Sequence, residues 1–209
     1  MRRILTTATV MAGLLSAAPA IANTEVLLSQ GGAAQAQFYL AEAGSCVTTD
    51  IFLIAYGGRS KEGPGGFEPW RALAVNIHRF DECTSVPLMS AYGDVYENSP
   101  NPPSVRISKS LDQATAQGVV EMYDSVQGVH FTVDVDLTWS ATSPVSRSFD
   151  HVTAQYPDVR VMYRNSDKSR DAAATGAIRE GGRNILAGPC EQSGGIYFGQ
   201  GTTIRITRR

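Results

Sequence analysis

The most regular pattern of apolar and polar positions in the chain runs from Val129 to Trp139. Every odd position in this segment is apolar, and every even position is polar or charged. Alternation with a period of two is typical of a β-strand that buries one face and exposes the other. The segment is therefore predicted to be a strand of a sheet that packs on a core.

The residues before it alternate in the same way, so Gln113–Ser140 is predicted to form a β-hairpin. A four-residue connection that contains Gly128 is an ordinary hairpin loop. The predicted register sets small Ala114 opposite large Trp139, an arrangement that suits a packed face. A slip of one residue would turn one apolar face to solvent, so the register is expected to be well defined.

A second antiparallel pair is predicted from Cys46–Tyr56 and Arg71–Cys83, which flank a stretch rich in glycine and proline. Its predicted register places Phe52 opposite Ile77 on the apolar face. A further strand is predicted at Ser104–Ser108, three others follow later in the chain, and two polar segments are expected to be irregular. The other expected strands are Val159–Tyr163, Ile196–Phe198 and Thr203–Thr207, and the irregular segments are Ala141–Tyr156 and the charged turn Arg164–Asp171.

No segment shows a sustained apolar stripe of helical period, and glycine, proline and asparagine separate many short strands. This pattern predicts an all-β fold, an antiparallel β-sandwich of the immunoglobulin-like or jelly-roll-like kind, with a β-barrel as the alternative. The proline-rich residues 98–103 are predicted to be a loop within one domain that spans residues 23–209.

The first 22 residues differ from the rest and are predicted to be a cleaved signal peptide. Arg2 and Arg3 precede an apolar stretch that is too short to span a membrane, and Ala20-Ile21-Ala22 fits a cleavage site. The chain is therefore expected to be exported, to the periplasm or the cell exterior, without an integral membrane segment. Its net charge of −2 argues against a nucleic-acid partner, because such proteins usually show a basic face.

The chain contains three cysteines, and an exported protein with an odd number is expected to hold one disulfide and one spare thiol. The register of the second strand pair sets Cys46 opposite Cys83, within the reach of a disulfide. These two residues are predicted to be bonded, which leaves Cys190 as the free thiol. A pairing that involves Cys190 stays open at this stage.

Motifs that name a reaction or a cofactor are missing from the sequence, so no catalytic residue and no cofactor are predicted. Asp134 and Asp136 point to the same side of the Val129–Trp139 strand, with His130 on that side, and could share a cation or a polar ligand. A solvated sheet face explains the same three residues more simply.

The function that these observations favour is a non-enzymatic binding, interaction or structural protein of the cell envelope or exterior. Its partner is not identified by the sequence, and another envelope or extracellular protein is one candidate. The alternative is an exported hydrolase whose active site is assembled from loops, since a Ser/His/Asp set need not be close in sequence. A long exposed edge strand would favour the binding protein, and a cleft with clustered Ser, His and Asp would favour the enzyme.

Overall fold

A computed structural model describes residues 24–42, 44–187 and 190–207. The predicted signal peptide lies outside the described residues. The described part contains strands and no helix, and all strand pairs are antiparallel, which confirms the all-β prediction. The strands are β1 (Thr24–Ala41), β2 (Val47–Glu62), β3 (Glu68–Asp81), β4 (Val86–Tyr96), β5 (Ser104–Ile107), β6 (Gln113–Asp124), β7 (Val129–Ala141), β8 (Ser146–Gln155), β9 (Val159–Glu180), β10 (Arg183–Asn184) and β11 (Cys190–Thr207).

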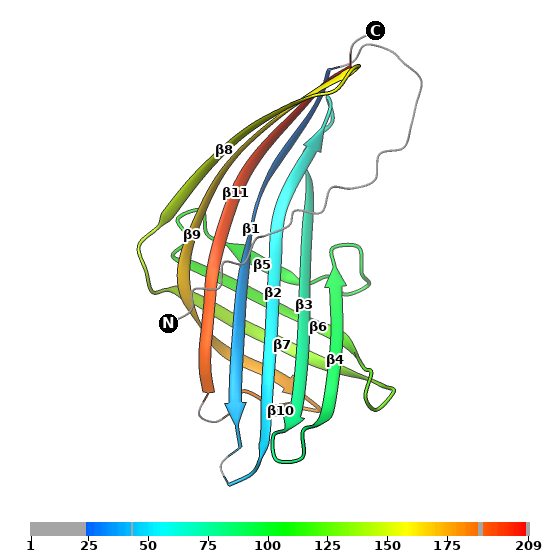
Figure 1. Ribbon diagram of the computed structural model, residues 1–209, viewed down its shortest axis with the longest axis vertical. Coiled ribbons are helices and arrows are strands. Elements are labelled where there is room, and N and C mark those ends of the chain that lie inside the picture. Colours follow the sequence, from blue (N-terminus) through cyan, green and yellow to red (C-terminus); the bar gives the residue numbers. More distant parts are fainter. Residues whose placement is uncertain (1–23, 43, 188–189, 208–209) are drawn as a thin grey trace.

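All the strands belong to one strongly curved sheet. Its pairings run from β9 through β11, β1, β2, β3, β4 and β6 to β7, and β7 pairs with β9 again. The long strands form one layer, and β5, β6 and β7 cross behind them at an angle (Figure 1). The apolar core lies between these two layers, as the packing of a sandwich requires. The described residues include no helix that could span a bilayer.

The predicted hairpin Gln113–Ser140 is confirmed as β6 and β7, with the predicted register. Ala114 pairs with Trp139 and Met122 pairs with Phe131. Trp139 is fully buried, and its Nε1–H donates to the backbone oxygen of Gln35 at 2.9 Å, so the only polar atom of its ring is satisfied. The strict alternation of this segment therefore predicted both the strands and the face that is buried.

The predicted register of β2 and β3 is wrong by one residue. Ile51, not Phe52, pairs with Ile77, so Ile51 and Leu53 face the core while Phe52 and Ile54 lie on the outer face. The cause is that this segment of β2 is apolar at both odd and even positions, so its pattern does not specify which face is buried.

The predicted disulfide between Cys46 and Cys83 is confirmed, with a distance of 5.5 Å between their Cα atoms. The two cysteines lie just beyond the paired residues Val47 and Asp81, at one end of the β2–β3 pair. A change of one residue in register therefore leaves them close enough to bond.

The segments predicted to be irregular are strands instead. Ala141–Tyr156 contains β8, and the supposed charged turn Arg164–Asp171 lies inside β9, where it pairs with β8 on one side and β11 on the other. The loop predicted at residues 98–103 does lie outside the strands, between β4 and β5.

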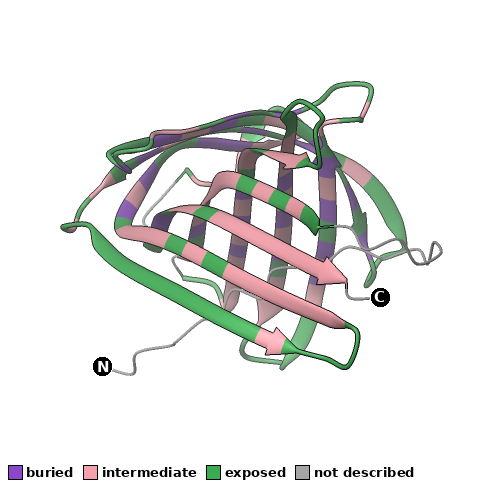
Figure 2. Ribbon diagram, turned by 90° about the horizontal axis from the view of Figure 1, so that it is seen from above, coloured by how far each residue is buried: buried purple, intermediate pink, exposed green. Residues whose placement is uncertain are grey.

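Several strands extend well beyond the core as a curved sheet, seen at the top of Figure 1, which we call the arm. The remainder of the curved sheet, which encloses the core, is called the ring. Figure 2 shows buried residues concentrated in the ring, whereas the arm is intermediate or exposed throughout most of its area. The arm consists of β8, residues 159–171 of β9, 197–207 of β11, 24–33 of β1, 57–62 of β2 and 68–71 of β3.

Candidate functional site

The three residues predicted as a ligand site lie together on the outer face of β7. The Asp134 carboxylate is 3.6 Å from Nη1 of Arg179, and the Asp136 carboxylate accepts a hydrogen bond from Gln117 at 3.0 Å. The His130 ring packs against Tyr123, with 4.9 Å between ring centroids. Each of the three side chains thus has a partner on a neighbouring strand.

The cysteines offer little for chemistry. Cys46 and Cys83 lie close to Asp81, but the disulfide removes both thiolates as metal ligands. The pKa of Asp81 is lowered mainly by a hydrogen bond from the side chain of Thr84. Hydrogen bonds from the backbone of Thr84 and of Cys83 lower it further. Cys190 is an exposed free thiol at the start of β11, as predicted for the residue left over.

One row on the outer face brings together Asp50, His78 and Ser90, a set that sequence reasoning missed. The three residues are neighbours on β2, β3 and β4, and Ser90 Oγ lies 3.3 Å from His78 Nδ1. The Asp50 carboxylate, however, accepts two hydrogen bonds from Gln37, at 3.0 and 3.1 Å. A catalytic triad needs the carboxylate to orient the imidazole and a pair of free donors for the oxyanion. The row has the serine–histidine contact alone.

Tyrosines gather beside this row on the same outer face. The Tyr92 and Tyr96 hydroxyls both donate to the Asp94 carboxylate, the latter at 2.8 Å. This hydrogen bond is the main reason that the pKa of Tyr92 rises to about 12, with burial and the charge of Asp94 adding to it. The two phenols are therefore held protonated as donors, and the cluster braces the outer surface of β4.

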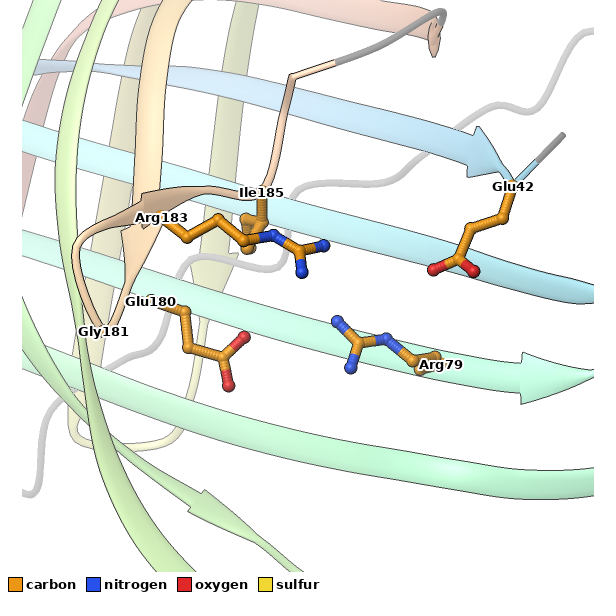
Figure 3. A pocket seen from close by; sticks show the side chains of 6 residues that line it. All are labelled: Glu42, Arg79, Glu180, Gly181, Arg183 and Ile185. Carbon is orange, nitrogen blue, oxygen red and sulfur yellow. The ribbon is translucent and has the colours of Figure 1, made fainter.

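A cavity of about 470 Å³ opens at the end of the ring opposite the arm, and we call it the mouth cavity. Arg79 of β3 and Arg183 of β10 extend toward the same space as Glu42 and Glu180 (Figure 3). The Nε of Arg79 is buried and makes no hydrogen bond within the described residues. Two cations and two anions balance here, so the mouth cavity has no net preference for a charged ligand.

The arm differs from the mouth cavity, because it separates charges of opposite sign onto its two faces. Residues paired directly across antiparallel strands point to the same side of a sheet. The buried row Ile196–Ala34–Ala55–Leu73 of the ring therefore fixes which side of the arm continues the core, and we call that side the inner face.

The inner face of the arm carries nearly all the basic residues of the arm strands and none of the acidic ones. Among the described residues, only Arg71 and Arg170 of this set form ion pairs, with Glu97 and Asp112. The basic residues are Arg59, Lys61, Arg71, Arg147, Arg160, Arg164, Lys168 and Arg170.

The outer face of the arm shows the opposite charge. Arg205 is its one basic residue within the described strands, and it pairs with Glu25 at 3.7 Å. Burial, followed by repulsion from Asp150, raises the pKa of Asp167. The acidic residues of the arm strands all lie on this face, namely Glu25, Glu62, Glu68, Asp150, Asp167 and Asp171.

On the inner face the cations lie in two rows, one on β8 and β9 and the other on β2. We call the strip of the face between the two rows the channel, and β11 and β1 form its floor. Arg59 is held along the floor, where its Nε and Nη2 donate to Gln30 Oε1 at 3.2 and 2.9 Å and its guanidinium lies 4.7 Å from the centre of the Phe67 ring. A hollow of about 440 Å³, lined also by Lys109 and Phe198, lies beside Arg59 where the arm meets the ring.

Comparisons with known proteins leave the family open. No family model and no curated protein matches the sequence. Among solved structures, an acetoacetate decarboxylase-like enzyme from Sphingomonas wittichii RW1 is similar over 88% of this chain and 92% of its own, at 11% identity and a TM-score of 0.31. The outer membrane protease OmpT of Escherichia coli covers 88% of this chain and 96% of its own, at 10% identity and a TM-score of 0.15. Similarity this low carries no inference about fold or activity.

Proposed function

We propose that this chain is an exported, non-enzymatic binding protein that holds an anionic partner on the inner face of the arm. The observation that carries the proposal is the separation of charge, with basic residues on one face of the arm and acidic residues on the other. The whole chain has a net charge of −2, so a face of one sign does not simply follow from composition. Unpaired like charges repel one another, and a partner of opposite charge removes that cost.

The accessibility of this face supports a binding role. Arg59, Arg147 and Arg164 are exposed, and Lys61 and Lys168 are half-exposed. Basic side chains gathered on one face raise the positive potential there and speed the capture of an anionic partner. The edge strand β8, whose side chains are almost all exposed, gives the partner open access from one side of the channel.

Export is part of the proposal and rests on the predicted signal peptide. The Cys46–Cys83 disulfide supports it, because such bonds persist mainly in oxidising compartments. Mass spectrometry of the protein from the cell exterior or periplasm is expected to find an N-terminus at Asn23. An intact Met1 in a chain that stays in the cytoplasm would contradict this part.

The binding proposal is tested by retention on immobilised dextran sulfate, with uncharged dextran as the matched control. The native chain is expected to bind dextran sulfate alone. The logarithm of the association constant should fall linearly with the logarithm of the salt concentration. The expected slope is about −4, for six unpaired cations on a single-stranded polyanion. Absence of retention at low salt, or a slope near zero, would overturn the proposal.

An exported hydrolase is the second candidate, and the contact between Ser90 and His78 is the observation in its favour. A fluorophosphonate probe, which reacts with activated serines, tests it. The hydrolase predicts labelling of the native chain that Ser90→Ala abolishes. If the chain is a binding protein, no labelling is expected. The Asp50 carboxylate accepts its hydrogen bonds from Gln37, so the His78 imidazole has no carboxylate to orient it.

A further inference from the structure

We infer that the anionic partner is a linear acidic polysaccharide lying lengthwise in the channel of the inner face. This inference rests on the proposed function and adds the chemistry of the partner. It is carried by the part of the floor nearest the ring, where the amide and hydroxyl side chains of Gln30, Gln200 and Thr202 lie between the two rows of cations.

The dimensions of the channel suit a single extended chain. The two rows of cations, on β9 and β2, are separated by three strand spacings, which amounts to about 14 Å. Arginine and lysine side chains can reach inward from both edges to a chain on the floor.

The cations repeat along the channel, as the charges of a polymer do. Arg160, Arg164 and Lys168 follow one another on β9 at intervals of four residues, or about 13 Å each. Arg59 and Lys61 face them from β2 at an interval of about 7 Å. A small anion would use one or two of these groups, whereas a polyanion satisfies the whole series.

Part of the floor offers hydrogen bonds rather than charge. Gln200 and Gln30 form one row across it beside Ser166 of β9, and Thr202 lies in the next row, whereas Leu28, Val26 and Ile204 make the floor apolar farther along the arm. Amides and hydroxyls can both donate and accept, and so can the hydroxyl groups of a sugar. Since Gln30 already accepts from Arg59 through its oxygen, its amide N–H groups remain to donate to a ligand. A chain rich in both carboxylates and hydroxyls matches this combination.

Single-stranded nucleic acid fits the channel less well. Proteins that bind it present successive aromatic side chains on which bases stack. The inner face of the described arm strands carries Phe149 on β8 and Phe198 on β11, in different rows and on strands separated by β9. These two rings cannot form a continuous stacking platform.

The experiment compares four ligands with the native chain at one low salt concentration: polygalacturonate, a 25-nucleotide oligothymidylate, vesicles of anionic phospholipid and uncharged dextran. Polygalacturonate is expected to bind at least tenfold more tightly than the other polyanions at equal charge, and dextran is expected not to bind. The discriminating variant is Gln200→Ala/Thr202→Val, which removes floor groups and no charge. This variant should bind polygalacturonate about fivefold or more weakly than the native chain does, and its affinity for oligothymidylate should be unchanged.

Circular dichroism and the urea midpoint of the floor variant show that it is folded, and Thr203→Val on the opposite face of β11 is its matched control. Equal affinity for all polyanions would contradict the inference that the partner is a polysaccharide, and so would a floor variant that binds polygalacturonate as tightly as the native chain. Either result would leave the proposed binding function intact. Failure to bind any polyanion would overturn both.

Discussion

The ring and the arm share the strands β1, β2, β3, β9 and β11, yet their inner faces have opposite character. In the ring, β9 turns Ala172 and Ala174 toward the core, where both are buried. In the arm, the same face of the same strand presents Arg164 and Lys168. The period of two continues without a break, and only the chemistry of the inward positions changes. Alternation therefore specifies the strand, whereas the residue type at the inner positions decides between a core and a binding face.

Glycines mark the place where ring becomes arm. Gly31 and Gly58 lie side by side under the Trp70 ring on the outer face, and a Cβ on either would collide with that ring. Gly32 likewise approaches the backbone oxygen of Tyr197. Close approach of this kind, which only glycine permits, lets the strands bend together at the boundary.

The largest effect is expected in the core of the ring. Trp139→Ala removes a fully buried ring and leaves a cavity, which should cost about 3–5 kcal/mol of unfolding free energy. Urea denaturation monitored by circular dichroism measures it. A loss below about 1 kcal/mol would show that the ring does not depend on this core.

Removal of the Cys46–Cys83 disulfide is expected to cause the next largest loss of stability. The bond joins residues separated by 37 positions, and on the loop-entropy model its removal costs about 4 kcal/mol. Cys46→Ser/Cys83→Ser is compared with Cys190→Ser, which changes an exposed thiol and should be neutral. If the two variants lost stability equally, the bond would have no special role in the ring.

A smaller effect is expected at Gly176, which pairs with Leu137 in the ring. Its φ is +133°, and a Cβ would collide with the backbone oxygen of Asp136. Gly176→Ala should therefore destabilise the chain by about 1–3 kcal/mol. Gly66→Ala is the matched control, because nothing lies within 4 Å of its added Cβ. Equal urea midpoints for the two variants would contradict the strained conformation.

Asp124 should make stability depend on acid pH. Its carboxylate is buried, which by itself raises the pKa, but hydrogen bonds from the backbone N–H groups of Ser90, Val126 and Gln127 outweigh this and lower it. A pKa below the unfolded value of about 3.9 gives stability that is present above that pH and is lost as pH falls toward the folded value. Urea midpoints of the native chain should drop between pH 6 and pH 3, and those of Asp124→Asn should drop less. If the urea midpoints of the two proteins fell in parallel over this pH range, a contribution of Asp124 to the pH dependence would be excluded.

The smallest effect on stability is expected in the arm. Arg164→Gln/Lys168→Gln should change the free energy of unfolding by no more than about 0.5 kcal/mol, because neither side chain is in an ion pair among the described residues. A slight gain would agree with relief of repulsion along β9. A loss of several kcal/mol in the free energy of unfolding, measured as for the core variant, would mean that these cations stabilise the fold and are not reserved for binding a partner.

The sequence predicted best where a pattern admitted a single solution. Val129–Trp139 alternates strictly, and its register follows from that alone. The pattern predicts the wrong face for Phe52, because this segment of β2 is apolar at both odd and even positions. It predicts a turn at Arg164–Asp171, because charged residues seldom mark a strand, but a solvated arm has no core that requires apolar ones. The basic face was hidden for a related reason, since acidic residues alternate with basic ones along the chain and nearly cancel in the net charge.

The most direct measurement compares two charge reversals of equal size in binding to polygalacturonate at fixed low salt. Arg164→Glu/Lys168→Glu acts on the inner face, whereas Arg106→Glu/Arg205→Glu acts on β5 and on the outer face of the arm. The inner reversal is expected to weaken binding by at least about thirtyfold and the outer one by less than about threefold. Equal weakening by both pairs would show that binding follows net charge alone, and would contradict a partner site on the inner face of the arm.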